Sequence, residues 1–261
     1  MNTSLKINRS KLKKIGHNSY DYMGGILISW PVLFFKCSIF VKDIEKKNTY
    51  IYVNNFYYYF SKFVFCFGFL NNLSLNNTLK NIIKLKFILN NILPIHCAAI
   101  TNKKNIDLFF GLSGSGKSEM IKRENFRNKN IISDDLIFYK EDQIFSLNSY
   151  INTRRLKFIN ILDYFLPNFI SKKRTKIKQY INSTSLKKKK INFYMLEKKN
   201  YEIKKIKESL LKEKISVLID RSNNFLDNRV LLTYFFLNPK IYIFFKKNTK
   251  KLIFNFFKKL K

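Results

Sequence analysis

The chain has 261 residues, 46% of them hydrophobic, which is enough for one large domain or two small ones with a buried core. Its 50 Lys and Arg residues against 17 Asp and Glu residues give a formal net charge of +33. Such a charge indicates either an anionic partner, such as nucleic acid or a membrane surface, or lysine used as surface filler. The lysines are spread along a chain rich in Asn, Ile, Phe and Tyr, as an AT-rich genome would encode. This favours the second interpretation, and we expect no specific nucleic-acid partner.

The cysteines and the apolar runs give no indication of a metal or redox site, a signal peptide or a membrane span. Cys37, Cys66 and Cys97 show no metal-ligand or redox spacing, so each is expected to be a small buried hydrophobe. The basic N-terminal segment has no signal-peptide core, and the apolar runs 24–35 and 63–70 are too short to cross a bilayer. We expect a cytoplasmic protein without a transmembrane segment. The oligomeric state stays open, a homo-oligomer included.

Residues 1–77 are predicted to form a β-rich N-terminal region. Four segments there are rich in Ile, Val, Phe and Tyr and are separated by Asn, Lys and Gly, which is typical of antiparallel strands. These segments are residues 25–30, 32–41, 50–60 and 63–70. The apolar period then changes to three and four residues, which predicts a helix over 78–93 that stops at Pro94.

Residues 78–261 are predicted to form a second domain in which strands and helices alternate. The expected strands are 95–100, 106–110, 130–133, 136–139, 143–147 and 191–196. The expected helices after Pro94 are 118–127 and 201–214, the latter with its apolar residues on one face. Residues 171–190 are polar and basic and are expected to be a surface insertion.

The segment from Gly111 to Ser118, with the sequence GLSGSGKS, satisfies the phosphate-loop pattern GxxxxGK[ST]. Glycines let consecutive backbone N–H groups turn toward phosphate oxygens, and the helix that follows directs its positive end at the same anion. Lys117 can then reach the β- and γ-phosphates, and the Ser118 hydroxyl can ligate Mg²⁺. A chance match in a flexible loop is the alternative. The chain's scarcity of glycine, 7 in all, argues against it because three of them lie here.

Asp134 and Asp135 follow the predicted strand 130–133, a helix and a strand after the loop. Adjacent carboxylates at a strand end suit one metal ligand and either one general base or a ligand of a second metal, although a simple turn or cap would use the same residues. His96 lies at the beginning of the strand predicted over 95–100, which should lie beside the loop strand, so it could face the phosphates. A lone histidine in an apolar strand is more often a core residue.

Residues 94–118 and 131–135 together resemble the nucleotide site of ATP-dependent phosphoenolpyruvate carboxykinase, with its His-Cys-Ser-Ala segment, FFGLSGTGKT loop and acidic pair. The same core is shared by the HPr kinase/phosphorylases, whose loop reads GKSE as at Ser118 and Glu119. Residues 191–197 look like the tail segment of HPr-kinase-related proteins. The resemblance implies an α/β fold with a mixed sheet, in which a P-loop core like the carboxykinase and HPr kinase C-terminal domains follows the β-rich region.

The resemblance also implies roles for individual residues. His96 and Asp135 would hold a divalent metal together with Ser118, and Asp134 would be the base toward an acceptor hydroxyl. Lys117 would stabilise the transferred phosphoryl group. Arg154 or Arg155 would replace a phosphate-binding lysine that this chain lacks, although a solvated basic surface explains the pair equally well. The nucleotide would be bound by Gly111, Ser113, Gly114, Ser115, Gly116, Lys117, Ser118 and Glu119.

Neither parent activity fits in full, because no oxaloacetate-binding residues and no glycine-rich segment after the acidic pair can be recognised. The sequence therefore predicts an HPr-kinase-related phosphotransferase. It would use ATP with Mg²⁺ or Mn²⁺ to phosphorylate a serine-type hydroxyl on a peptide, a protein or a small molecule. The alternative is a P-loop ATPase associated with nucleic acid or an anionic membrane surface, through Lys187–Lys190 and the C-terminal lysines. The identity of the acceptor cannot be predicted from the sequence.

Overall fold

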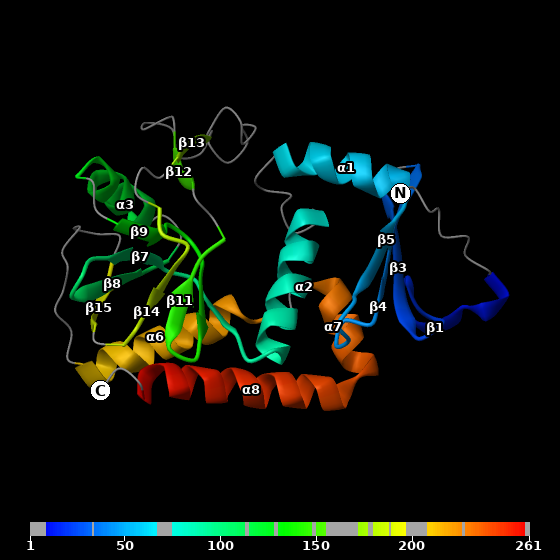
Figure 1. Ribbon diagram of the computed structural model, residues 1–261. Helices are drawn as coiled ribbons and strands as arrows, with labels where there is room; N and C mark the ends of the chain where they lie inside the picture. The colour runs from blue at the N-terminus through cyan, green and yellow to red at the C-terminus, as the bar shows by residue number, and fades with distance from the viewer. Residues whose placement is uncertain are drawn as a thin grey trace. The chain divides into compact units, whose positions relative to one another are not determined.

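The computed structural model has a mixed α/β architecture (Figure 1). It describes residues 9–32, 34–66, 75–112, 115–127, 130–147, 150–154, 172–176, 180–187, 189–196, 208–225 and 228–258. The chain divides into two compact units. The first comprises Met1–Lys86, Phe158–Phe169 and Phe225–Phe244, and the second comprises Phe87–Lys157, Ile170–Asn224 and Phe245–Lys261.

The first unit contains a five-stranded antiparallel sheet in which chain order and sheet order agree. After a short 3₁₀ helix, η1 (Arg9–Lys11), the strands are β1 (Lys13–Gly16), β2 (Ser19–Tyr22), β3 (Gly25–Val32), β4 (Phe35–Lys42) and β5 (Tyr50–Val53). Side chains alternate between the two faces of the sheet. Leu27 packs with Tyr22 and Phe40 on one face, while its neighbours Ile26 and Ile28 are also buried. Of the strands predicted in residues 1–77, those over 25–30 and 32–41 are found as β3 and β4.

Beyond Val53 the prediction of strands over 50–60 and 63–70 is wrong, because residues Asn55–Cys66 form helix α1. Asn54 caps this helix: its side-chain Oδ1 accepts a hydrogen bond from the Tyr57 backbone N–H at 3.1 Å. Phe56 and Phe60, one helical turn apart, stack with ring centroids 5.7 Å apart. Residues 67–70 lie outside the described part of the chain. Capping and one-turn aromatic contacts have overridden a β-type composition.

Helix α2 (Leu75–Leu89) confirms the helix predicted over 78–93, although it starts before residue 78 and ends before residue 93. Asn91 has a φ of 60°, and the Ile92 N–H donates to the Phe87 carbonyl at 2.9 Å. This is a helix-ending motif that usually has glycine at the left-handed position. The domain boundary predicted between residues 77 and 78 lies inside α2 and stays a prediction. Two further helices, α7 (Arg229–Leu237) and α8 (Pro239–Lys258), were not predicted.

The second unit contains a four-stranded sheet in the order β15-β8-β7-β9. Its strands are β7 (Ala98–Thr101), β8 (Asn105–Phe110), β9 (Asn130–Ser133) and β15 (Lys190–Met195). β7 is antiparallel to both β8 and β9, whereas β15 is parallel to β8. The predicted single strand over 95–100 is divided: β6 (Leu93–Ile95) belongs to another sheet, and His96 and Cys97 connect the two strands.

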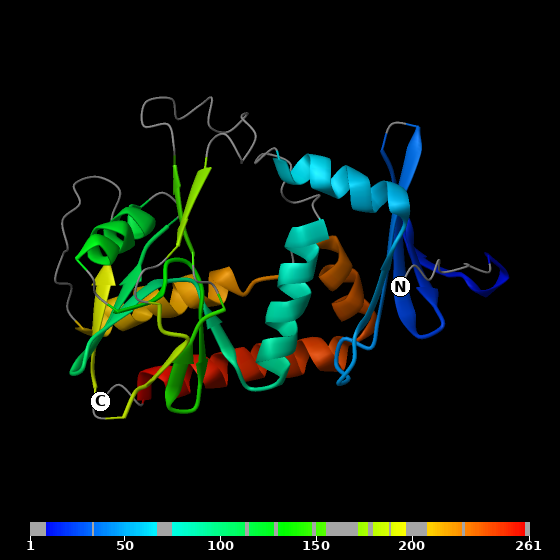
Figure 2. The same cartoon turned by 45° about the horizontal axis from the view of Figure 1, so that its top comes forward.

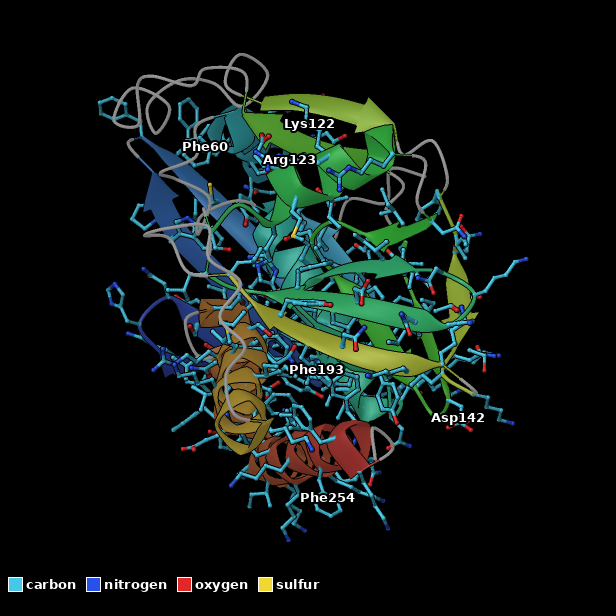
Figure 3. All side chains as sticks on the ribbon, turned by 90° about the vertical axis from the view of Figure 1, so that its left-hand side faces the viewer. Phe60, Lys122, Arg123, Asp142, Phe193 and Phe254 are labelled. Carbon is cyan, nitrogen blue, oxygen red and sulfur yellow. The ribbon has the colours of Figure 1, made fainter. Side chains whose placement is uncertain are left out.

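Alternate side chains of this sheet pack on different layers. Phe109 on β8 packs with Ile121 of α3 (Lys117–Phe126), whereas the next residue, Phe110, lies near Phe193 of β15. Phe193 in turn contacts Phe256 of helix α8, with ring centroids 6.2 Å apart. Figure 3 shows α3 on one side of the sheet, and α8 and α6 (Glu208–Ser222) on the other.

A second sheet of this unit has the order β14-β11-β10-β6, and a separate hairpin joins β12 to β13. These strands are β10 (Ile137–Lys140), β11 (Gln143–Phe145), β14 (Ser183–Ser185), β12 (Tyr150–Arg154) and β13 (Lys172–Lys176). The predicted hairpin around residues 140–142 is confirmed as β10–β11 (Figure 2). The basic segment 171–190 contributes β13 and β14, and β14 is an edge strand of the sheet.

Candidate functional site

Three strand ends meet at one edge of the sheet β15-β8-β7-β9. Because β7 is antiparallel to both β8 and β9, its first residue lies at the edge where β8 and β9 end. The glycine-rich segment leaves β8 at Gly111, the acidic pair leaves β9 at Asp134, and His96 precedes β7. The topology therefore gathers residues that lie up to about forty positions apart in the sequence.

The segment between β8 and α3 has room only for glycine at two positions. A Cβ at Gly111 would lie 2.4 Å from the Ser115 Oγ and 2.7 Å from the Leu196 carbonyl oxygen. Gly116 has a φ of 93°, in the region that other residues rarely adopt. The predicted binding residues Ser113 and Gly114 lie outside the described part of the chain. Gly111 and Gly116 are thus needed for the backbone path itself.

Lys117, the first residue of α3, reaches back into this segment. Its Nζ donates to the Gly111 carbonyl at 2.6 Å and to the Leu112 carbonyl at 3.1 Å. The residue is only 7% exposed. Burial lowers the pKa of the ammonium below its ordinary value, and Asp135 and Cys97 partly oppose that shift. A cation held by two carbonyls in this way can exchange them for phosphate oxygens.

Ser115 supplies a buried donor next to this lysine. Its Oγ is buried and has no hydrogen-bond partner among the described residues. An unsatisfied buried hydroxyl costs about 1–3 kcal/mol, and an incoming oxygen acceptor would remove that cost. The start of α3 adds unpaired backbone N–H groups and a positive dipole end. Ser118 is half-buried and Glu119 is exposed in the same turn.

His96 and Asp135 form a pair at the same edge, with His96 Nδ1 3.2 Å from Asp135 Oδ1. Their side chains are 37% and 57% exposed, so both stay open to solvent. The structure thus brings together two of the three predicted metal ligands. No cluster of three or more His, Cys, Asp and Glu residues is found in the described chain. Mg²⁺ commonly takes one or two carboxylates and completes its shell with water and phosphate, which this donor set fits.

The two adjacent aspartates have opposite environments. Asp134 is only 1% exposed, whereas the Asp135 side chain is 57% exposed. The turn between them is held by Ser133, whose Oγ donates to the Leu136 carbonyl at 3.0 Å and accepts from the Leu136 N–H at 3.2 Å. One carboxylate is therefore buried and the other accessible to solvent, so we expect the two groups to have different roles.

The structure says less about the two predicted arginines, Arg154 and Arg155. Arg154 is the last residue of β12, opposite Lys172 of β13, and β12 packs on α3. The Arg154 side chain and the whole of Arg155 lie outside the described part of the chain. Their catalytic role stays a prediction.

The structure places two further residues, Leu196 and Cys97, next to the site, although neither was predicted from the sequence to have a role there. Leu196, just after β15, donates its N–H to the Phe110 carbonyl at 2.8 Å and flanks Gly111 with its own carbonyl. Cys97 is fully buried, as predicted; burial raises its pKa, and its charge would interact with Lys117 and Asp135. The strand before Leu196 is predictable from its apolar pattern. Its pairing with β8 has no local signal.

Among known protein families, one matches the part of the chain that contains this site. Residues 77–161 match the family model of phosphoenolpyruvate carboxykinase. The matched segment includes the glycine-rich loop, His96 and the acidic pair, and it covers less than half of the chain. No curated protein matches the sequence. No helix in the described ranges is both long and apolar enough to span a membrane.

Proposed function

We propose that the protein binds ATP at residues 111–118 and transfers the γ-phosphoryl group to a serine-type hydroxyl on a peptide, a protein or a small molecule. One arrangement carries the proposal: buried Lys117 and the unpaired Ser115 hydroxyl lie at the sheet edge that also holds the His96–Asp135 pair. The match to the phosphoenolpyruvate carboxykinase model supports ATP-dependent phosphoryl transfer or binding. The hydroxyl acceptor rests on the likeness to the HPr kinase/phosphorylases.

In the proposed complex, Lys117 exchanges the carbonyls of Gly111 and Leu112 for oxygens of the β- and γ-phosphates. The Ser115 hydroxyl and the N–H groups at the start of α3 donate to the same phosphates. The Ser115 hydroxyl is buried and already in place, so it can stabilise developing charge without reorganising at the moment of transfer. Positioning and charge stabilisation of this kind account for most of the catalysis of phosphoryl transfer.

The divalent metal would be held by Ser118, Asp135 and His96. Bound there, Mg²⁺ or Mn²⁺ would neutralise charge on the β- and γ-phosphate oxygens. Asp135 keeps its ligand atoms accessible, and the 3.2 Å contact with His96 holds the two side chains at one place. The exposed side of the pair leaves room for water and phosphate in the coordination shell.

Asp134 is the proposed general base. It accepts the proton of the acceptor hydroxyl as the oxygen–phosphorus bond forms and the bond from the γ-phosphorus to the bridging oxygen of ADP breaks. Asp134 is buried, so an acceptor must come close to the loop before its hydroxyl contacts the carboxylate. The exposed Asp135 is the rival for this role, and variants of the two residues test the assignment.

The test follows the γ-phosphate itself. The full chain is incubated with Mg²⁺, ATP labelled in the γ-phosphate, and either free serine or a library of serine-containing peptides. Label in phosphoserine supports the proposal. Label released only as inorganic phosphate supports the P-loop ATPase alternative, and failure to bind ATP in calorimetry excludes both.

A further inference from the structure

Helix α8 is fixed to the protein along one face. Its residues Phe245, Leu252 and Phe256 are buried, and Phe256 packs edge-on against Tyr139 with ring centroids 5.0 Å apart. The Asn248 Nδ2 donates to the Ile88 carbonyl at 2.5 Å. Because these contacts set the rotation of the helix, they also determine which residues face outward.

The opposite face of α8 combines lysines with apolar side chains. Exposed residues recur at spacings of three, four and seven, so they form one stripe along the helix. The stripe consists of Lys240, Ile243, Phe244, Lys247, Lys250, Lys251, Phe254 and Lys258. Ile243 and Phe244 are each 53% exposed and Phe254 is 66% exposed. Figure 3 shows Phe254 on the side of α8 away from the sheet.

The charge of this stripe is of one sign. Helix α8 contains no Asp or Glu in its 20 residues, and none of the stripe lysines forms an ion pair with a described residue. An ordinary solvated surface mixes both signs and keeps large apolar side chains scattered. The stripe is therefore complementary to an anionic partner that also accepts apolar groups.

We propose that the exposed stripe of α8 binds the surface of an anionic lipid bilayer, with the helix lying in the membrane plane. The lysines attract anionic headgroups, each contributing a several-fold gain in affinity. Ile243, Phe244 and Phe254 enter the boundary between headgroups and acyl chains, while the lysine stems extend back to the headgroups. The helix would lie on the bilayer without crossing it.

Two other occupants fit the stripe less well. A second copy of the chain in a symmetric dimer would place the same lysine-rich surface against itself, and the like charges would repel. Duplex nucleic acid would engage the lysines through its phosphates but offers Ile243, Phe244 and Phe254 no apolar environment. A lipid surface satisfies both components of the stripe.

The test measures co-sedimentation of the full chain with vesicles of phosphatidylcholine, with and without phosphatidylserine. Binding is expected only to the phosphatidylserine vesicles. K247E/K250E/K251E should lower that affinity on the order of 10²-fold or more. The matched control K11E/K13E/K14E changes exposed lysines of the first unit by the same total charge, and it should lose much less.

The apolar component is tested separately. F244S/F254S should weaken vesicle binding about tenfold while leaving binding to a DNA duplex unchanged. The control Phe34→Ser removes a side chain that is 98% exposed elsewhere and should have no effect on vesicles. Circular dichroism confirms that each variant is folded. Equal losses of vesicle affinity for the two lysine triple variants, or unchanged vesicle binding by F244S/F254S, would overturn the proposal. Stronger binding of the chain to DNA than to vesicles would also overturn it and would assign the stripe to nucleic acid.

Discussion

The five-stranded sheet of the first unit and the sheet β15-β8-β7-β9 of the second use similar apolar residues but distribute polar groups differently. In the first, each strand runs antiparallel to its neighbours in the chain, so successive strand ends alternate between two edges. In the second, β8, β9 and β15 all end at one edge, where β7 begins. The antiparallel pairing of β7 with both β8 and β9 therefore brings the glycine-rich segment, the acidic pair and His96 to one edge of the second sheet, whereas none of the candidate site residues lies in the first sheet.

The largest difference in phosphoryl transfer is expected between replacing Lys117 of the second unit and replacing Lys86 of the first. Lys117→Ala should reduce phosphoryl transfer on the order of 10³-fold or more, because no other described cation reaches the loop carbonyls. Lys86 in the first unit has similar local bonding, with its Nζ 2.9 Å from the Lys47 carbonyl and 2.6 Å from the Thr49 Oγ1. Lys86→Ala should leave transfer unchanged in the same radiolabel assay. Equal losses would mean that the loop is not the reacting region.

The next largest effects are expected from replacing each of the two aspartates at the sheet edge, and they should differ in kind. Asp134→Asn should lower transfer on the order of 10²–10³-fold while nucleotide still binds, because the amide keeps the shape but cannot accept the proton. Asp135→Asn should instead raise the Mg²⁺ concentration needed for half-maximal rate by about tenfold. Metal titrations of both variants, with nucleotide affinity measured in parallel, separate the roles. Near-normal transfer by Asp134→Asn would make Asp134 structural.

A smaller effect should appear as pH dependence of nucleotide binding. Burial lowers the pKa of Lys117 in the free protein, and phosphate binding requires the charged form. Affinity for ATP should therefore fall as pH rises through that lowered pKa, earlier than for a lysine with an ordinary pKa of 10.5. Calorimetry across alkaline pH measures the shift. Lys117→Arg keeps its charge there, so a persistent fall in that variant would assign the titration to another group.

The smallest effect is confined to the first unit. Asn54 caps α1 and ties it to β4, because its Oδ1 also accepts from the Ser38 N–H at 3.0 Å. Asn54→Ala should lower the free energy of unfolding by about 1–2 kcal/mol in urea denaturation. ATP affinity should be unchanged if the units behave independently. A parallel loss of ATP affinity would show that the two regions are coupled.

Local signals in the sequence predicted the loop region well. The pattern GLSGSGKS, the strand before it and the helix after it are all set by residues close in sequence, and α3 starts one residue from its predicted position. The strand Asn130–Ser133 was predicted to the residue. The predicted and observed elements agree here because the glycine positions and the apolar periods indicate the same structure.

The failures have a common physical origin in contacts that the local sequence does not encode. The aromatic run Asn55–Cys66 has β-type composition, yet capping by Asn54 and stacking of Phe56 on Phe60 make it a helix. The strand predicted over 95–100 is divided because Leu93–Ile95 pairs with β10 in another sheet. The proximity of His96 and Asp135 was implied only by family resemblance, since no local pattern relates the two residues.

The pairing of β15 with β8 has a consequence for the order of folding. Leu196 flanks Gly111, so one side of the loop is formed by a segment some eighty residues downstream. Closing so long a connection carries an entropic cost, so we expect β15 to join the sheet after the neighbouring strands β7 and β8 have paired. During synthesis, a nascent chain that has exposed the whole glycine pattern still lacks one wall of its binding loop. Competence to bind nucleotide should thus emerge only after residue 196 has left the ribosome.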